Sequence, residues 1–203
     1  MNELSARGEV HWAHGDLSKV SVPGRIVSES LEALGGLDVL VNNAGLTVGK
    51  PALELDADDF ESIFSVDVRA AFLLAREAAS HMRDNGGGSI VNITSVHEHV
   101  PRPGFSLYAS AKAALGMLTR GLALEWAEYG IRVNAVAPGL IATERNDEAD
   151  DLAGEVPAGR AGEPDEVAAL VSFLVSEQAR YITGASILVD GGAAQAPLRT
   201  PAF

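Results

Sequence analysis

The chain alternates strictly between short apolar segments and longer amphipathic ones, with no repeat or linker between them. The short segments read EVHWAHGDL, LDVLVNNAG, GSIVNITS, GIRVNAVAPG and ASILVDGG, and they begin at residues 9, 37, 88, 130 and 185. The segments between them have helical spacing and predict helices over 24–36, 56–85, 106–129 and from 162 onward. Strands that alternate with helices in this way predict an α/β fold: a doubly wound, Rossmann-like parallel sheet with helices on both faces.

Composition fits one packed domain. The 203 residues are 47% hydrophobic and 21% charged, and we expect a single domain over residues 1–192 with a tail over 193–203. The net charge of -13 argues against a nucleic-acid or anionic-membrane partner. The chain has no cysteine, no apolar leader at its start and no apolar run long enough for a bilayer, so we expect a cytoplasmic protein.

Polar groups gather where the predicted strands end. Ser95 closes one strand, residues 42–45 (NNAG) follow another, and residues 138–139 follow a third. In parallel sheets ligands bind at the carboxyl ends of the strands. Tyr108 begins the next helix, and Lys112 lies four residues later on the same helical face. These groups are expected to meet at one rim of the sheet.

A phenol beside an ammonium is a usable proton donor and acceptor. A free phenol has a pKa near 10 and is about 0.1% ionised at neutral pH. An ammonium about 5 Å away stabilises the phenolate by about 3 kcal/mol at an effective dielectric near 20, or roughly two pKa units. Ser95 holding a substrate oxygen while Tyr108 exchanges its proton suits the interconversion of a carbonyl and an alcohol, with the hydride supplied by a bound cofactor.

Five motifs follow one another in an order typical of one family. They are NNAG, SIVNITS, YASAK, VNAVAPG and ITGASILVDGG. From about Val10 to Gly192 the chain resembles the short-chain dehydrogenase/reductases. The resemblance implies that Ser95, Tyr108 and Lys112 are catalytic and that Lys112 also holds the nicotinamide ribose.

The same resemblance implies a cofactor, NAD or NADP, and assigns no metal. Beside Tyr108 and Lys112, it implies contacts from residues at the carboxyl ends of strands and in the loops after them: Asp16, Leu17, Asn42, Ala44, Gly45, Pro138, Gly139, Ile141 and Thr143. Asp16 and Leu17 would border the adenine, and the last four would flank the nicotinamide. The helices over 56–85 and 106–129 resemble the pair through which family members dimerise, so a homodimer or homotetramer is expected.

Asp67 departs from the family pattern. The family usually has an asparagine there, which helps a bound water relay protons to the lysine. A carboxylate would accept hydrogen bonds but add a negative charge near Lys112. A solvated helix residue is the alternative, and the role of Asp67 stays open.

The second departure is larger. Family members begin with a strand, a glycine-rich turn that cradles the cofactor's pyrophosphate, and a second strand, and this first β-α-β unit is expected to be lacking here. No G-x-G-x-x-G occurs, and neither NGGGS at 85–89 nor GLTVGKP at 45–51 replaces it. The strand near Val10–His14 would lose its neighbour, LDVLVNN would form an open edge, and we expect the N-terminal segment to repack over that edge. The preference between NAD and NADP stays undecided.

Parts of the sequence bear on other functions. A family member that keeps the fold and oligomer interface but binds dinucleotide weakly or not at all is the alternative. No G-x-S-x-G elbow supports a serine hydrolase. The loop SVHEHVP is similar to that of bacterial glucose 1-dehydrogenases, which favours a sugar, polyol or related alcohol, although a 3-oxoacyl-thioester reductase fits the other motifs. His97 and His99 are interpreted as surface or substrate-pocket residues rather than metal ligands.

Overall fold

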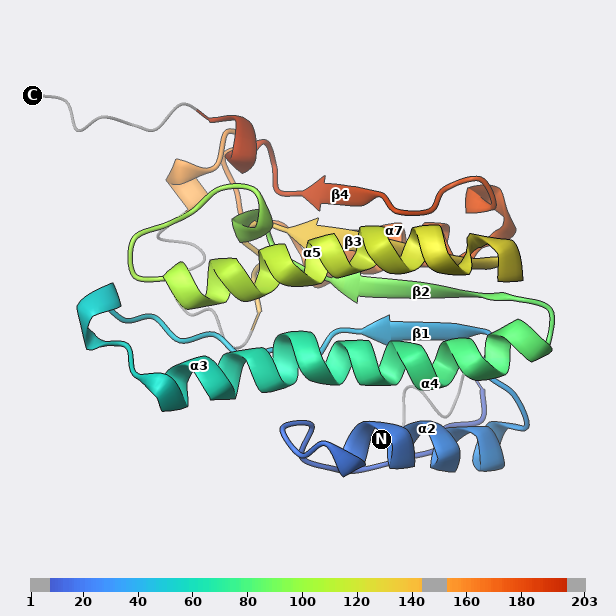
Figure 1. Ribbon diagram of the computed structural model, residues 1–203. Helices are drawn as coiled ribbons and strands as arrows, with labels where there is room; N and C mark the ends of the chain where they lie inside the picture. The colour runs from blue at the N-terminus through green and yellow to red at the C-terminus, as the bar shows by residue number, and fades with distance from the viewer. Residues whose placement is uncertain (1–7, 144–152, 197–203) are drawn as a thin grey trace, which may run out of the picture.

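The computed structural model describes residues 8–143 and 153–196. These residues form a four-stranded parallel sheet flanked by helices (Figure 1). The strands are β1 (Val39–Asn42), β2 (Gly88–Ile93), β3 (Ile131–Pro138) and β4 (Ser186–Val189). The α-helices are α2 (Ser21–Leu34), α3 (Ala57–Phe64), α4 (Ala71–Asp84), α5 (Ser106–Trp126) and α7 (Pro164–Val175).

The strands pair in chain order, β1-β2-β3-β4, and every pair is parallel. Their carboxyl ends therefore lie at the same edge of the sheet, where the arrows point in Figure 1. The predicted α/β parallel architecture is confirmed, and its four ordered strands correspond to the last four of the five predicted strand segments.

Two apolar layers hold the sheet between helices. On one face α4 and α5 contribute Met82 and Leu122, which pack with Ile90 and Val133 of the strands. On the other face Leu174 of α7 packs with the neighbouring strand residues Val91 and Val136. Adjacent residues of a strand point to opposite faces, which explains why β2 and β3 read as continuous apolar runs.

The predicted helix over 56–85 consists of α3, a π-helical turn η2 (Ser65–Ala70) and α4. It begins at a capping box, in which the Asp56 side chain accepts from the Asp59 N–H and the Asp59 side chain accepts from the Asp56 N–H. A π turn inside an α-helix is uncommon and is often found at functional sites. Here it contains Asp67, which is buried.

The aromatic residues of this helix do not form the core. Met82 is fully buried, but Phe60 is 43% exposed, and Phe64 and Phe72 are only partly buried. Phe64 and Phe72 instead line a surface groove between this helix and α5, together with Met117. Small alanines of α4 make the close contact with the sheet, and Phe72 packs against the edge of their cluster.

Strand β1 is less buried than its sequence suggests. Val39 and Val41 are 38% and 40% exposed, although an apolar run such as LDVLVNN is typical of a strand buried on both faces. The reason is position: β1 is the edge of the sheet, and α7 packs on β2 and β3. The open edge expected at this segment is confirmed. An apolar run is therefore no proof that both faces are covered.

The N-terminal segment is not a strand. Described residues 8–20 contain no β-structure, so both the strand predicted at EVHWAHGDL and its repacking over the edge of β1 are wrong for this part of the chain. Arginine side chains hold the segment instead: Arg25 donates to the His14 carbonyl at 2.6 Å and Arg69 donates to the Ser18 carbonyl at 2.6 Å. Without a neighbouring strand, the backbone of this segment has no hydrogen-bond partners with which to form a strand, despite its alternating pattern.

The C-terminal tail is described only in part. Of the tail expected over 193–203, Ala193–Gln195 form a 3-10 turn and residues 197–203 lie outside the described part. No helix in the described part combines the length and apolar character that a bilayer crossing requires.

Candidate active site

Ser95 lies just beyond the carboxyl end of β2. Its backbone is extended, it caps the 3-10 turn Val96–Glu98, and it is 6% exposed. Its Oγ accepts a hydrogen bond from the His97 N–H at 3.1 Å. A hydroxyl both donates and accepts, so this contact leaves the Ser95 O–H proton for another acceptor.

Tyr108 and Lys112 lie in the first two turns of α5, on the same face of the helix. The Lys112 Nζ is 5.6 Å from the centroid of the Tyr108 ring. This is the arrangement that the four-residue spacing predicts. The ammonium is thus close enough to stabilise negative charge on the phenol oxygen.

Lys112 is 4% exposed and bridges three elements. Its Nζ donates to the carbonyl of Ile93, the last residue of β2, at 3.1 Å. It also lies 3.1 Å from Asp67 Oδ2, in the π turn between α3 and α4. An ammonium carries three donors, so the hydrogen bond to Ile93 leaves capacity for a ligand.

The Asp67 carboxylate is fully buried, which makes the alternative of a solvated helix residue wrong. Its Oδ1 accepts from the Leu46 N–H at 2.7 Å. Its Oδ2 is within ion-pair distance of Lys112, but the contact lacks the angles of a hydrogen bond. Gly45 packs on this pair: a Cβ there would lie 3.1 Å from the Lys112 Nζ and 3.2 Å from Asp67 Oδ2.

His97 lies beside Tyr108. Its ring meets the Tyr108 ring edge-on, with centroids 6.0 Å apart, and stacks on Phe105 at 5.7 Å. Its Nδ1 is 2.9 Å from the Val100 carbonyl oxygen. Since the same residue contacts Ser95 through its N–H, His97 connects the serine and the tyrosine of the site.

Glu98 is a residue whose importance the sequence does not reveal. Its side chain is 4% exposed, accepts from the Ser186 hydroxyl at 2.8 Å and pairs with Arg120 at 3.3 Å. It also packs on Gly116, where a Cβ would clash with its carboxylate. Glu98 therefore anchors the loop that carries Ser95 to α5 and β4. Its partners lie 22 and 88 residues away, so no local pattern marks it.

Among the residues predicted to hold the cofactor, the NNAG group lies at the carboxyl end of β1. Asn42 is 7% exposed and donates to Asn92 Oδ1 at 2.9 Å and to the Ala71 carbonyl at 3.2 Å, so its side chain braces the strand end. Its own Oδ1 is buried and has no hydrogen-bond partner. Ala44 is exposed and Gly45 is partly buried. Ala44 and Gly45 have little or no side chain, so the backbone at this edge of the sheet is accessible to a ligand.

Pro138 ends β3, and Gly139 follows it against β4. The Gly139 N–H donates to the Val189 carbonyl at 3.0 Å, and a Cβ at Gly139 would lie 2.8 Å from the Asp190 Cα. Ile141 forms an isolated parallel bridge with Gly162, and Thr143 is exposed. These residues continue the same edge of the sheet.

Asp16 and Leu17 lie in the turn before α2. The Asp16 Oδ1 accepts from the Ser18 N–H at 2.9 Å, and hydrogen bonding from Ser18 holds the pKa of the Asp16 carboxyl below its ordinary value. Arg69 of the π turn donates to the Ser18 carbonyl at 2.6 Å. The turn is therefore attached to the element that carries Asp67.

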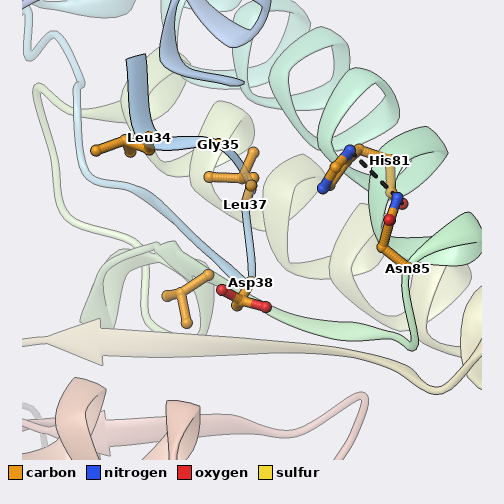
Figure 2. Close-up of a pocket in the computed structure, with 8 residues that line it drawn as sticks. Leu34, Gly35, Leu37, Asp38, His81 and Asn85 are labelled. Atoms are coloured by element: carbon orange, nitrogen blue, oxygen red, sulfur yellow. Dashed lines mark hydrogen bonds between the residues drawn. The ribbon is translucent and has the colours of Figure 1, made fainter. Parts of the chain in front are cut away.

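A hollow at the other end of the sheet is separate from these residues. It is lined by the end of α2, the residues leading into β1, and the end of α4 (Figure 2). His81 and Asn85 face each other there, and Asp38 lies below them. Because this hollow lies at the amino end of β1, it contains none of the predicted site residues.

Known proteins resemble the chain over most of its length. A family model described as enoyl-(acyl carrier protein) reductase matches residues 1–194. The glucose 1-dehydrogenase of Gluconobacter oxydans is 42% identical over 193 residues, which are 91% of this chain and 73% of that protein. The chain belongs to the short-chain dehydrogenase/reductase family.

Solved structures of other short-chain dehydrogenases agree with this fold. The acetoin dehydrogenase YohF from Salmonella typhimurium has a TM-score of 0.89 and 43% identity, over 97% of this chain and 80% of that one. A gluconate 5-dehydrogenase from Burkholderia cenocepacia, in complex with NADP and tartrate, has a TM-score of 0.85 and 35% identity, over 90% of this chain and 74% of that one.

The residues present fit the nicotinamide half of a dinucleotide. Lys112 retains donor capacity for a ribose hydroxyl. Ala44 and Gly45 present little side chain at the end of β1, and Pro138 and Gly139 lie at the end of β3 on the same edge.

Proposed function

We propose that the protein is an NAD(P)-dependent oxidoreductase that interconverts an alcohol and a carbonyl, with Tyr108 as the general acid and base. The observation that carries the proposal is the Lys112 Nζ, 5.6 Å from the Tyr108 ring. His97 contacts both Ser95 and Tyr108, which supports the assignment of the hydroxyl, the phenol and the ammonium to one site beyond the end of β2.

Each residue then has a defined task. In the reducing direction, the Ser95 O–H donates a hydrogen bond to the substrate carbonyl oxygen and orients it. Tyr108 transfers its phenolic proton to that oxygen, and the Lys112 ammonium stabilises the phenolate that remains. Bound NADH or NADPH supplies the hydride that the carbonyl carbon accepts. In the oxidising direction, the Tyr108 phenolate removes the proton from the alcohol.

We propose a small polar alcohol or ketone as substrate. Relatives and structural neighbours of this chain are named glucose 1-dehydrogenase, acetoin dehydrogenase and gluconate 5-dehydrogenase. Their substrates are hydroxyl-rich or otherwise polar, in keeping with the SVHEHVP loop. A panel of acetoin, glucose, gluconate and a 3-oxoacyl thioester tests the proposal, and activity on the thioester alone would overturn the substrate class.

Cofactor binding separates this enzyme from an inactive member of its family. Titration with NADH and NADPH, followed by their fluorescence, is expected to show binding at millimolar concentration or below. No binding at millimolar cofactor would favour the inactive alternative, since the chain has no glycine-rich phosphate turn.

Substitution of the tyrosine tests the chemistry. Tyr108→Phe is expected to lower kcat by at least about 100-fold, the typical contribution of a general acid, and to leave cofactor binding nearly unchanged. Tyr129→Phe is the matched control, because Tyr129 lies beyond the other end of α5. Unchanged turnover in Tyr108→Phe would show that the proton donor has been misassigned.

We propose that the protein forms a homodimer or homotetramer through α5 and the helix from α3 to α4. Met117 and Leu124 of α5 are 62% and 83% exposed, and Phe60 of α3 is 43% exposed. The Phe60 and Phe64 rings stack with centroids 4.3 Å apart. The groove lined by Phe64, Phe72 and Met117 lies between the two helices. An apolar surface of this kind is typical of an interface between subunits.

A further inference from the structure

We propose that Asp67 is a positioning residue that neutralises Lys112 and thereby moves proton exchange at Tyr108 to higher pH. The proposal rests on the function proposed above and names how this site is regulated. The Asp67 carboxylate contacts the Lys112 ammonium and the Leu46 N–H, so it would act through Lys112.

The two charges are buried together. The Asp67 side chain is 0% exposed and the Lys112 side chain 5% exposed, with Oδ2 and Nζ 3.1 Å apart. A single charge at such a position is very unfavourable, whereas a close pair compensates itself. The ammonium next to Tyr108 is therefore half of an ion pair rather than a lone positive charge.

Other titratable groups near the site make contacts of their own. From the turn after β2, His97 faces the Tyr108 ring, and Glu98 is paired with Arg120. From the π turn, Arg69 reaches away to the Ser18 carbonyl. Among the ion pairs of the described residues, the one that Lys112 forms is with Asp67.

The sign of the effect follows from these positions. A lone ammonium favours the phenolate of Tyr108, and a carboxylate 3.1 Å from that ammonium opposes the same negative charge. Asp67 should therefore help Tyr108 to keep its proton. At neutral pH this favours proton donation during carbonyl reduction, and it makes alcohol oxidation require a more alkaline solution.

The carboxylate has a mechanical contact as well. Asp67 Oδ1 accepts from the Leu46 N–H at 2.7 Å, so the same group connects the turn after β1 to the lysine of α5. Asparagine is nearly isosteric and retains an oxygen that accepts from Leu46. Asp67→Asn therefore removes the charge and preserves this contact, which separates the electrostatic role from the structural one.

The first test is the pH dependence of turnover. In Asp67→Asn, the alkaline limb of carbonyl reduction and the rising limb of alcohol oxidation are both expected to move to lower pH by about one unit. Asp67→Ser should shift both limbs in the same direction, and it replaces Asp67→Asn in this test if the asparagine variant does not fold. Asp58→Asn, which removes an exposed carboxylate from the first turn of α3, should leave both limbs in place.

The second test needs no turnover. The ultraviolet absorbance of tyrosinate is recorded as a function of pH for the wild type and for Asp67→Asn. The curve of Tyr108→Phe is subtracted from that of the wild type, and the curve of the double variant Asp67→Asn, Tyr108→Phe is subtracted from that of Asp67→Asn. We expect the Tyr108 midpoint to be about one pH unit lower in Asp67→Asn. Equal midpoints, or a shift to higher pH, would overturn the proposal. If turnover is undetectable, the proposed function fails, and this titration still decides the role of Asp67.

Discussion

Asp67 and Lys112 come from different helices and meet in a part of the site that water does not reach. Each charge is stabilised mainly by the other, with the Ile93 carbonyl and the Leu46 N–H as additional partners. A family resemblance indicated that position 67 is unusual, but the direct ion pair is visible only in the structure. At the scale of the residue, this pair contributes both to stability and to chemistry.

Removal of one member of the pair should be more damaging than removal of both. Lys112→Met leaves a buried carboxylate without its counter-ion and is expected to lower the free energy of unfolding by about 3–5 kcal/mol. Asp67→Asn combined with Lys112→Met should recover at least half of that loss. Urea denaturation of the four proteins of the cycle gives the coupling energy. Additive effects of the two substitutions would show that the charges are not coupled.

Gly139 lies at the end of β3, where β4 approaches closely. An alanine Cβ there would lie 2.8 Å from the Asp190 Cα, a backbone atom that cannot turn away. Gly139→Ala is expected to destabilise the fold by about 1–3 kcal/mol, the range for overpacking. Thermal unfolding measures this loss of stability. Gly154→Ala is the control, because a Cβ at Gly154 meets nothing within 4 Å. An unchanged melting temperature would mean that the strand ends separate easily.

At the scale of the element, the helices follow their local sequence closely. The starts of α3 and α7 are specified by capping boxes at Asp56–Asp59 and Glu163–Glu166, and α2 ends at Gly35, with a φ of 75°. These signals need only a few neighbouring residues, so they can be read without the fold. The π turn around Asp67 has no such signal, and the periodicity of residues 56–85 predicts an ordinary helix there.

The start of α7 should make stability depend on pH. The Arg160 side chain and the Glu163 N–H hydrogen-bond to Glu166, and they lower the pKa of its carboxyl from 4.5 to about 2. Because the pKa is lower in the folded state, the stabilisation is present above about pH 4.5 and is lost as the pH falls toward 2.

Glu166→Gln tests this at the first turn of α7. The melting temperature at neutral pH should fall by a few degrees at most, because the pair is exposed. The difference from the wild type should vanish by about pH 2, where the native carboxyl is itself protonated. Asp165→Asn, in the same turn, is the control. A difference that stays constant down to pH 2 would assign the effect to the shape of glutamine rather than to charge.

At the scale of the whole molecule, two surfaces are more apolar than a lone subunit needs. One is the face of α5 with Met117 and Leu124, and the other is the edge strand β1 with Val39 and Val41. The first borders the groove lined by Phe64, Phe72 and Met117, and the second is an open edge of a parallel sheet.

Leu124→Lys should break the proposed oligomer. A charge on this face would have to be buried between two subunits, so the mass from light scattering is expected to fall by at least half. Val20→Lys is the matched control, since Val20 is also exposed and apolar but lies before α2. If the variant and the wild type have equal mass, the subunits associate through another surface or not at all.

Local sequence patterns account for the alternation of strands and helices, for most of the helix ends, and for the approach of Lys112 to Tyr108. These depend on residues within one or two helical turns of each other, where the periodicity of the backbone settles which side chains share a face. Ser95 could be placed at the carboxyl rim for a similar reason, because a parallel sheet puts all its strand ends together.

The loss of strand structure at residues 8–20, the burial of Asp67 and the anchoring of Glu98 depend on tertiary packing. A strand exists only if a neighbour offers it hydrogen bonds, and a residue is buried only if another element covers it. Asp67 meets Lys112 across 45 positions of sequence and Glu98 meets Ser186 across 88. Pairings over such distances are set by how the layers pack, which no local pattern records.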